Sequence, residues 1–466
     1  MQDTIFRMYD IRGKVGSELV IEETYDLIRA AGYYLTTKNS ALKTVAVGMD
    51  GRLSSPAIKA EVCRALRDSG LDVQFIGICP SPVLYFALNT LPVDAGIMIT
   101  ASHNPKEYNG FKICLGKTAL WGEEIQELKK LYKAKKSISS VTQGAYAELS
   151  LIPTYVDYLK NLFPNLVGMQ LPMVFDCGNA ATGVVMPLLV QKMQWPNAQL
   201  LYAELDGNYP NHDADPVVEE NMQDVKKILH STGTQVGIGF DGDGDRMAAM
   251  TKSGLLVPGD LMLALLCKSY VQQHPGATIV CDIKSSSGLL EAVANWGGVA
   301  CLSPSGHSLV KKSMKEHKAL VAGELSGHYF FYDRYFGYDD GIYAALRLLE
   351  LLHQTGKPLQ ELVAELPQKI SSPEFRIECD EQKKWTIVEA VKQELAQLPD
   401  AKMITIDGIR VTLAKGLGIL RASNTQPVLS LRFEADSDGD MRELKMVFIG
   451  ALEHYLDGAA LRKQIM

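Results

Sequence analysis

The sequence lacks the features that mark secreted, membrane-spanning and nucleic-acid-binding proteins. No charged segment followed by an apolar one stands at its start, so we expect no secretory signal and a cytoplasmic location. The longest apolar stretches, such as 261–267, are far too short to cross a bilayer, and we expect no membrane partner. No long run of Lys and Arg occurs and the formal net charge is −7, which argues against a nucleic-acid partner.

Disulfide and zinc signatures are missing as well. The eight cysteines are scattered, and no two of them form a C-x-x-C pair. Several lie within apolar strand or helix patterns, so buried free thiols in a reducing compartment explain them best. No redox or zinc role is indicated.

What the sequence does contain is the composition of a soluble globular protein with alternating strands and helices. It has 466 residues, of which 47% are hydrophobic and 22% charged. We expect strands over 44–49, 73–78, 96–100, 173–176, 236–240 and 278–283, and helices over 56–68, 123–136, 260–273, 308–316 and 339–352. This repeated pattern predicts layered sheets with helices on their faces.

The pattern changes after a segment rich in Pro and Ser, 367–373, which we interpret as a linker. Beyond it we expect strands over 374–379, 403–406, 409–413 and 428–434, and helices over 384–395 and 441–455. The Asp407–Gly408 pair between two of these strands is a hairpin signal. The C-terminal part is therefore predicted to be a smaller α+β domain, the fourth of the chain.

The first candidate site is the segment TASHNP at 100–105, which follows an apolar run that predicts a strand. Ser102 then lies at the carboxyl end of a strand, where α/β folds place their ligand sites. Its hydroxyl can accept a phosphoryl group, His103 is an acid–base or phosphate-donor candidate, and Lys112 lies on the next strand-like run. Taken alone, the motif is more typical of an ordinary capping serine.

The second is DGDGDR at 241–246, which places three carboxylates at alternate positions with glycines between them. Asp241, Asp243 and Asp245 can converge on one hard cation, and Mg²⁺ prefers such oxygen ligands. The sequence argues against an EF-hand, whose loop requires Gly at the sixth position and Glu at the twelfth, because Arg246 and Lys252 stand there. The plainer alternative is an acidic solvated turn, against which the apolar strand before the motif argues.

The third is GELSGH at 323–328. Glu324, Ser326 and His328 alternate, so in an extended segment they share one face. A carboxylate, a hydroxyl and an imidazole together suit vicinal sugar hydroxyls. A histidine with a purely structural role is an equally common explanation.

The fourth is RASNTQP at 421–427. Arg421, Ser423, Asn424 and Thr425, with the N–H groups of a turn, would make a cradle for a phosphate. A polar turn between strands is the alternative.

Taken together and in this order, the four motifs resemble the α-D-phosphohexomutase family, and FRMYDIRG at 6–13 resembles that family's N-terminal signature. The resemblance spans essentially the whole chain and is greatest to the bacterial phosphomannomutase/phosphoglucomutase branch, because of the GELSGH and RASNT forms of two loops. Phosphoglucosamine mutases usually carry an Arg-Pro-Ser-Gly-Thr loop instead, and that branch is the second candidate.

The resemblance implies a fold of four domains around a central cleft, with one loop from each domain in the site. Three related α/β/α domains with mixed sheets would cover 1–148, 149–254 and 255–368. A TATA-box-binding-protein-like α+β domain would cover 369–466.

The resemblance also implies a role for each site residue. Ser102 would carry the catalytic phosphate and bind Mg²⁺ together with Asp241, Asp243 and Asp245, while Arg246 would face the reacting atoms. The residues that would line the site, read the sugar or hold its second phosphate are Tyr9, Arg12, Lys284, His307, Glu324, Ser326, His328, Arg421, Ser423, Asn424 and Thr425.

The implied reaction interconverts hexose 6-phosphate and hexose 1-phosphate, of mannose, glucose or both. Phospho-Ser102 would transfer its phosphoryl group to the sugar through a hexose 1,6-bisphosphate, which serves as intermediate and activator; Mg²⁺ and Arg246 would offset the charge. His103 and Lys112 are the candidates for the base. We expect a monomer whose partner is a small-molecule phosphosugar. A phosphosugar hydrolase and a non-catalytic sugar-phosphate sensor are the alternatives from other classes.

Overall fold

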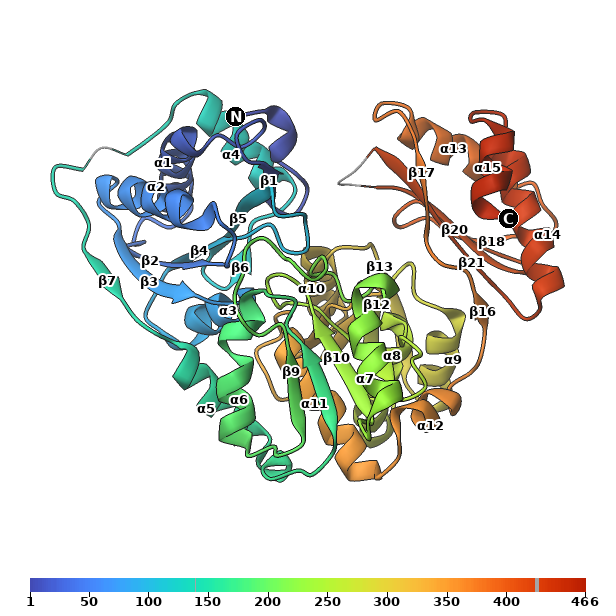
Figure 1. The fold of residues 1–466 in the computed structure, drawn as a ribbon. Coiled ribbons are helices and arrows are strands. Elements are labelled where there is room, and N and C mark those ends of the chain that lie inside the picture. Colours follow the sequence, from blue (N-terminus) through green and yellow to red (C-terminus); the bar gives the residue numbers. More distant parts are fainter. Residues whose placement is uncertain (139, 424–426) are drawn as a thin grey trace. The chain divides into compact units, whose positions relative to one another are not determined.

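The structure is a computed structural model that describes residues 1–138, 140–423 and 427–466. The chain forms two compact units, and its course can be followed by colour in Figure 1. Unit 1 comprises Met1–Leu266 and Ser326–Val363, and unit 2 comprises Cys267–Leu325 and Ala364–Met466. Each unit therefore combines an earlier and a later segment of the chain.

The first sheet of unit 1 has the strand order β1-β5-β4-β2-β3-β7, with β6 paired to β5. Its strands are β1 (Ile11–Lys14), β2 (Thr44–Met49), β3 (Asp72–Ile78), β4 (Ala95–Ile99), β5 (Tyr108–Leu115), β6 (Thr118–Ala119) and β7 (Tyr146–Glu148). β2 is parallel to β3 and β4, whereas β5 is antiparallel to β4 and β1, so the sheet is mixed as predicted. Because Met49 pairs with Ile99, the loops after β2 and β4 leave the sheet at the same edge.

Helices cover both faces of this sheet (Figure 1). On one face α1 (Ile21–Lys38) packs with α2 (Ser55–Asp68) and α4 (Glu123–Lys133), and on the other α3 (Ser81–Thr90) packs against β2 and β4. Apolar residues at helical spacing in α2, such as Ile58 and Val62, are fully buried in the resulting core. The helices predicted over 56–68 and 123–136 are confirmed, although the second ends at Lys133.

The second sheet of unit 1 has the order β11-β10-β8-β9. Its strands are β8 (Met173–Asp176), β9 (Ala198–Leu201), β10 (Val236–Phe240) and β11 (Met247–Thr251). The same part of the chain forms the helices α5 (Ile152–Leu162), α6 (Met186–Met193) and α7 (Gln223–Ser231). It also forms the short 3₁₀ helices η2 (Pro164–Leu166), η3 (Ala181–Val184) and η4 (Glu219–Met222). β10 is parallel to β8 and antiparallel to β11. Since both β10 and β11 are buried along their whole length, DGDGDR is a hairpin connection in the interior and not a solvated acidic turn.

The later segment of unit 1 packs on the second sheet. It contains β15 (Tyr329–Phe331), α11 (Gly341–Thr355) and the first residues of α12 (Leu359–Ala364), and α11 contacts β10 and β11. Asp340 caps α11 by accepting a hydrogen bond from the Tyr343 backbone N–H over 2.9 Å. Its carboxylate, which is 1% exposed, also accepts hydrogen bonds from the hydroxyls of Tyr155 and Tyr335, each at 2.8 Å. The short 3₁₀ helix η1 (Asp3–Ile5) is the first element of unit 1. The helix α8 (Gly259–Gln273) begins in unit 1 and ends in unit 2.

Unit 2 contains a parallel set of strands and an antiparallel sheet. In the parallel set β12 (Thr278–Asp282) lies between β13 (Val299–Ser303) and β14 (Val321–Gly323), accompanied by α9 (Ser287–Asn295) and α10 (His307–His317). The antiparallel sheet consists of β16 (Ile370–Ser371), β17 (Phe375–Glu378), β18 (Lys402–Ile404), β19 (Ile409–Leu413), β20 (Gly416–Ala422) and β21 (Val428–Ala435).

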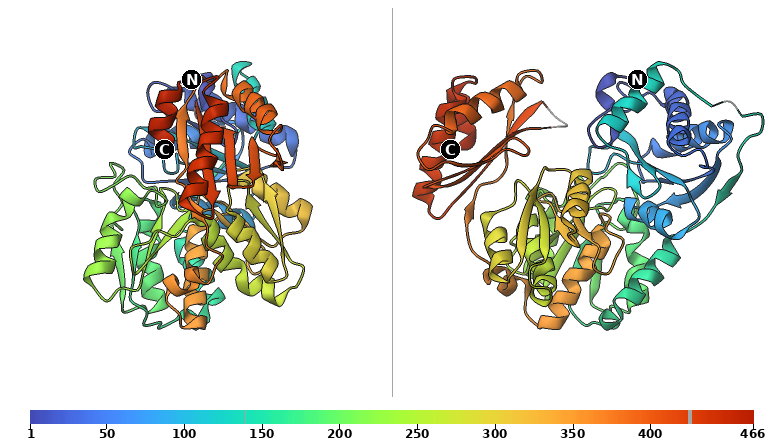
Figure 2. Two further views of the ribbon diagram at one scale, coloured as in Figure 1. Left: turned by 90° about the vertical axis from the view of Figure 1, so that its right-hand side faces the viewer. Right: turned by 180° about the vertical axis from the view of Figure 1, so that it is seen from behind.

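Three helices cover one face of the antiparallel sheet (Figure 2): α13 (Lys384–Leu395), α14 (Asp438–Leu452) and α15 (Gly458–Ile465). The predicted hairpin is confirmed, because β18 and β19 pair antiparallel and Gly408 between them has φ = +74°. The linker interpretation of 367–373 is wrong in part, since Ile370 and Ser371 pair with β21 as a short edge strand.

All eight cysteines are free thiols; six are buried, and Cys301 and Cys379 are half-buried. Among the helices of the described residues, none combines the length and the hydropathy that crossing a bilayer requires.

Candidate active site

Ser102 lies just past the carboxyl end of β4 and is 5% exposed. Its backbone φ is +51°, a left-handed conformation that costs a residue with a Cβ about 1–2 kcal/mol. Its Oγ donates a hydrogen bond to Asp241 Oδ2 over 2.9 Å and lies 3.1 Å from His103 Nδ1. A Cβ at position 242 would lie 2.2 Å from the Ser102 carbonyl oxygen, so Gly242 is what allows the two loops to meet.

The three aspartates of the β10–β11 connection converge as predicted. Asp241, Asp243 and Asp245 are at most 1% exposed, and each offers a carboxylate oxygen within 4.8 Å of the others. Lys112, on β5, makes ion pairs with the Oδ2 atoms of Asp243 and Asp245. Burial alone would lower the pKa of Lys112, but these two carboxylates outweigh it and raise that pKa well above its usual value. The arrangement therefore favours the ammonium form of Lys112.

The aspartates fit a hard divalent cation. While the Oδ2 atoms of Asp243 and Asp245 contact Lys112, the buried Oδ1 atom of Asp243 has no hydrogen-bond partner among the described residues, and Asp245 Oδ1 lies 3.3 Å from His328 Nε2. Buried carboxylate oxygens without a donor are costly unless an ion binds them. Oxygen ligands on three converging carboxylates are the set that Mg²⁺ prefers.

Arg246 and His103 complete the polar surroundings of Ser102. Arg246 Nε donates to Asp241 Oδ2 over 3.0 Å and Nη1 to Asp215 Oδ1 over 3.3 Å, whereas its buried Nη2 has no hydrogen-bond partner in the described part of the chain. His103 is half-buried, and its removal from water together with the nearby charge of Arg246 holds its pKa well below the usual value. His103 is therefore neutral at pH 7.

The N-terminal residues singled out by the sequence lie in unit 1. Arg12, on β1, donates from Nη1 to Asn104 Oδ1 over 2.6 Å and from Nε to Asp10 Oδ2 over 2.9 Å, so it contacts the loop that carries Ser102. Tyr9 is half-buried in the bend that precedes β1.

The segment 323–328 is not extended, and the expectation of one shared face is wrong. The chain turns at Leu325 and Ser326, and Gly327 has φ = +90°. Ser326 Oγ lies 2.9 Å from His328 Nδ1, and His328 Nε2 lies 3.3 Å from Asp245 Oδ1. His328 is thus brought to the aspartates of unit 1, whereas Glu324 belongs to unit 2.

In unit 2 the remaining candidates form a connected set. Glu324 Oε1 accepts a hydrogen bond from Gly306 N over 2.6 Å, directly before His307, the first residue of α10. The next residue towards the N-terminus, Ser305, donates its backbone N–H to Asp407 Oδ2 over 3.0 Å, and Arg421 Nη2 donates to the same oxygen over 2.7 Å.

Lys284 and Ser423 lie in the same unit. Lys284 Nζ is 3.6 Å from Glu374 Oε1, and this charge lowers the pKa of Glu374 to about 2. The carbonyl of Ser423 accepts a hydrogen bond from Lys384 Nζ over 2.7 Å. Asn424 and Thr425 lie outside the described residues.

Several contacting residues were not found from the sequence. They are Asp50, Arg52, Ser81, Asp215 and Asp339 in unit 1, and Glu374 and Asp407 in unit 2. Asp50 offered the clearest signal, because it directly follows the buried strand β2 at the edge where Ser102 lies. Asp407 was interpreted only as part of a turn.

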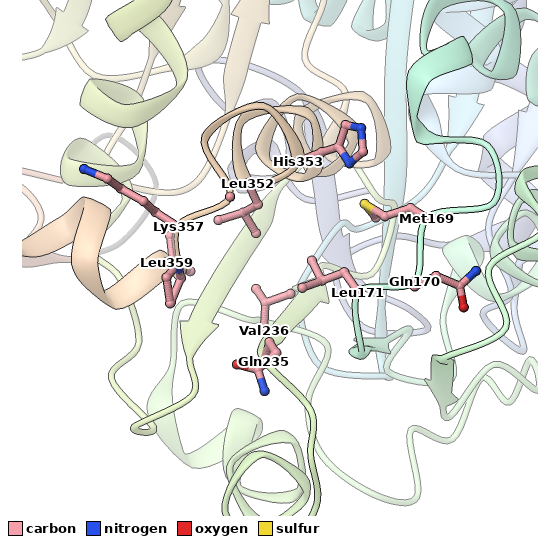
Figure 3. Close-up of a pocket in the computed structure, with 11 residues that line it drawn as sticks. Met169, Gln170, Leu171, Gln235, Val236, Leu352, His353, Lys357 and Leu359 are labelled. Atoms are coloured by element: carbon pink, nitrogen blue, oxygen red, sulfur yellow. The ribbon is translucent and has the colours of Figure 1, made fainter.

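A cavity of about 340 Å³ lies elsewhere in unit 1 (Figure 3). Leu171, Val236, Leu352 and Leu359 give it largely aliphatic walls. It lies at the amino end of β10, and since Asp241 follows the carboxyl end, the strand separates the two by about 16 Å. None of the residues singled out above lines it.

Comparisons with known proteins agree along nearly the whole chain. Family models match residues 3–139, 153–254 and 258–370 as phosphoglucomutase/phosphomannomutase alpha/beta/alpha domains I, II and III, and residues 374–451 as the C-terminal domain. A phosphomannomutase/phosphoglucomutase of Pseudomonas syringae pv. tomato is 42% identical over 453 residues, 97% of this chain and 96% of the relative. A phosphoglucomutase of Neisseria gonorrhoeae is 38% identical, over 96% of each chain. A crystal structure of a phosphoglucomutase/phosphomannomutase family protein from Burkholderia thailandensis has a TM-score of 0.90 at 35% identity and covers 97% of this chain and 98% of its own.

Proposed function

The chain belongs to the phosphoglucomutase/phosphomannomutase family, and from this we propose that it is a phosphosugar mutase, an isomerase that interconverts hexose 6-phosphate and hexose 1-phosphate. The observation that carries the proposal is the placement of Ser102 Oγ, 2.9 Å from an aspartate of a buried acidic triad and 3.1 Å from a neutral imidazole. Relatives named for glucose, or for mannose and glucose, support these two sugars as substrates.

In the proposed reaction Ser102 carries the phosphoryl group. The free hydroxyl oxygen of the sugar attacks phosphorus, the bond from phosphorus to Ser102 Oγ breaks, and the hydroxyl proton passes to a base. A hexose 1,6-bisphosphate results, and the reverse step with its other phosphate restores phospho-Ser102 and releases the isomer. Such transfers rest on positioning and electrostatic stabilisation.

We assign the metal site to Asp241, Asp243 and Asp245, together with a phosphate oxygen on Ser102. A Mg²⁺ ion there would withdraw charge from the transferring phosphoryl group. The unpartnered Nη2 of Arg246 is a donor suited to a phosphoryl oxygen. The Oδ1 atom of Asp243, which has no donor among the described residues, supports the metal assignment.

Three groups are candidates for the proton transfer. His103 is neutral and lies beside Ser102 Oγ, so it has the form that a base requires, and His328 is a second imidazole at the aspartates, 3.3 Å from Asp245. Lys112 is held as an ammonium by two carboxylates, which better suits a role in stabilising charge. We propose that a histidine takes the proton.

The remaining residues are proposed to recognise the substrate. Arg421, Ser423, Asn424 and Thr425 would hold the phosphate that is not reacting, because a guanidinium with hydroxyls and amides suits that group. The sugar and its surroundings would be contacted by Tyr9, Arg12, Lys284, His307, Glu324, Ser326 and His328. Domain boundaries after residues 148, 254 and 368 would give each of these loops its own domain.

The decisive experiment is a coupled assay with glucose 1-phosphate, mannose 1-phosphate and glucosamine 1-phosphate, in which inorganic phosphate is measured in parallel. We expect turnover of the first, the second or both, with little free phosphate. A preference for glucosamine 1-phosphate would indicate a phosphoglucosamine mutase, stoichiometric phosphate release a hydrolase, and binding without turnover a sensor.

Ser102→Ala tests the proposed role of Ser102 as the phosphoryl carrier. We expect it to remain folded, to lose at least about 10³-fold in kcat and to take up no phosphate from glucose 1,6-bisphosphate by intact-mass spectrometry. Turnover near that of the unsubstituted protein would contradict the role of Ser102.

We also propose a cytoplasmic monomer. The eight free thiols suit a reducing compartment. Light scattering after size exclusion would test the monomer, and cell fractionation the location.

A further inference from the structure

Arg52 is a buried arginine beside the candidate active site to which the four sequence motifs give no role. It follows the carboxyl end of β2 by three residues and is 1% exposed. A buried guanidinium is tolerated only when its charge and its N–H groups are satisfied. The groups that satisfy Arg52 therefore indicate what it does.

Four of its N–H groups bind one loop. Nη2 donates to the carbonyls of Ser102 and Asn104 over 2.7 and 2.5 Å, and Nη1 to those of Pro105 and Tyr108 over 2.7 and 3.0 Å. Arg52 is thus the centre around which the loop carrying Ser102 folds. The same hydrogen bonds satisfy four main-chain carbonyl oxygens, which need donors when they are buried.

The fifth N–H group fixes the guanidinium itself. Nε donates to Asp50 Oδ2 over 3.1 Å, and Asp50 Oδ1 accepts hydrogen bonds from Arg52 N and from Ser55 Oγ at the start of α2. Since a guanidinium has five N–H groups, all are engaged by protein atoms. Arg52 therefore has no donor left for a substrate phosphate.

A second loop covers the guanidinium. The ring of Tyr209 lies over Arg52, with 5.4 Å from the guanidinium carbon to the ring centre. The same loop continues to Ala214, whose carbonyl accepts a hydrogen bond from Gly242 in the aspartate connection over 3.1 Å. Arg52 is consequently fixed between the loop of Ser102 and a segment that also contacts the aspartates.

We propose that Arg52 is the positioning residue of the Ser102 loop. It acts through the main chain, by holding the left-handed backbone of Ser102 so that Oγ stays at Asp241, and it does not touch the reacting atoms. A displacement of about 1 Å at a reacting group can cost about 10²-fold in rate. The inference rests on the proposed function, because it assumes that Ser102 carries the phosphoryl group.

Arg52→Lys tests the proposal, because it keeps the charge and removes the planar fork that binds four carbonyls. We expect kcat to fall about 10²-fold while KM for the sugar phosphate changes less than about 3-fold. Phosphorylation of Ser102 by glucose 1,6-bisphosphate, followed by intact-mass spectrometry, should slow by a similar factor. A folded variant with unchanged kcat and unchanged phosphorylation rate would overturn the proposal.

Arg347→Lys is the matched control. Arg347, on α11, is also a buried arginine of unit 1, but it forms an ion pair with Asp333 over 2.8 Å. We expect it to lower the melting temperature while kcat stays within about 2-fold. If it lowered kcat as much as Arg52→Lys does, the effect at Arg52 would be one of general stability, and the proposal would fail.

Tyr209→Leu keeps the proposal testable if Arg52→Lys does not fold. It removes the ring over the guanidinium and leaves the hydrogen bonds in place, so we expect a 3- to 10-fold loss of kcat with unchanged KM. An unchanged kcat would contradict the positioning role of Arg52. Failure of the proposed function is distinguishable, because then the unsubstituted protein itself would show no turnover and no phosphorylation of Ser102.

Discussion

Two cations contact four carboxylates at the candidate site of unit 1, whereas in unit 2 each of two cations of the proposed ligand set contacts one carboxylate. In unit 1, Lys112 contacts Asp243 and Asp245, and Arg246 contacts Asp241 and Asp215. The carboxylates in these contacts outnumber the two cations, and a phosphate on Ser102 would add more negative charge. Charge alone therefore favours a divalent cation at this site.

In unit 2, two cations each contact one carboxylate. Lys284 lies 3.6 Å from Glu374, and Arg421 donates to Asp407 over 2.7 Å. Such pairs need no metal, and an incoming phosphate can compete with a carboxylate for the same cation. Under the proposed function, unit 1 would stabilise a reacting group and unit 2 would bind a charged group reversibly. Substitutions in the two units should accordingly change different kinetic parameters.

Asp243→Asn should have the largest effect, because it removes a charged ligand from the proposed metal site. We expect kcat to fall at least about 10³-fold and the Mg²⁺ concentration for half-maximal rate to rise 10- to 100-fold. Initial rates over a Mg²⁺ series, and the shift of the melting temperature by Mg²⁺ without substrate, would measure both.

Glu374→Gln provides the contrast in unit 2. It removes a carboxylate from a matched pair, so the Mg²⁺ dependence should stay unchanged. If both substitutions altered that dependence equally, or if Asp243→Asn left it intact, the division between the units would be wrong.

Lys112→Met should come next. It leaves the buried Oδ2 atoms of Asp243 and Asp245 without their cation, which costs about 3–5 kcal/mol in comparable buried pairs, and kcat should fall about 10²-fold. Added Mg²⁺ should raise the melting temperature of this variant more than that of the unsubstituted protein, since the ion supplies the missing charge. Equal shifts in calorimetry would show that Lys112 does not compensate the aspartates.

Arg421→Lys should act on binding. It keeps the charge but loses the planar pair of donors, so KM should rise about 10-fold while kcat stays within about 3-fold. Steady-state kinetics with glucose 1-phosphate would measure this. A fall in kcat at constant KM would instead place Arg421 with the reacting groups and break the comparison.

The sequence predicted the parts of this comparison that depend on local patterns. Ser102 and Asp241 follow apolar strands, and β10 has the predicted bounds, because a buried strand and the polar residues after it are adjacent in the chain. The acidic triad converges within one hairpin connection, so its spacing alone was sufficient.

The partners of these residues could not be predicted in the same way. Arg52 binds the carbonyl of a residue 50 positions away, and backbone acceptors leave no mark in a sequence. Asp407 belongs to a turn by every local criterion, and only the pairing of β19 with β20 brings it to Arg421. The turn at Ser326 was missed because alternation of polar residues does not distinguish an extended segment from one that ends at a left-handed Gly327.

Two carboxylates, one in each unit, have surroundings that shift their pKa values in opposite directions, and the effect expected from them is on stability. Burial raises the pKa of Asp340 to about 6, whereas Lys284 lowers the pKa of Glu374 to about 2. The protonated form of Asp340 therefore stabilises the fold fully below about pH 4, and this contribution is lost as the pH rises through 6. For Glu374 the contribution is present above about pH 4.5 and is lost as the pH falls towards 2. Urea unfolding at several pH values should show the advantage of the unsubstituted protein over Asp340→Asn shrinking by up to about 3 kcal/mol from pH 4 to 7, and its advantage over Glu374→Gln shrinking below pH 4.5. Slopes of the same sign for both variants would show that the two carboxylates do not differ in this way.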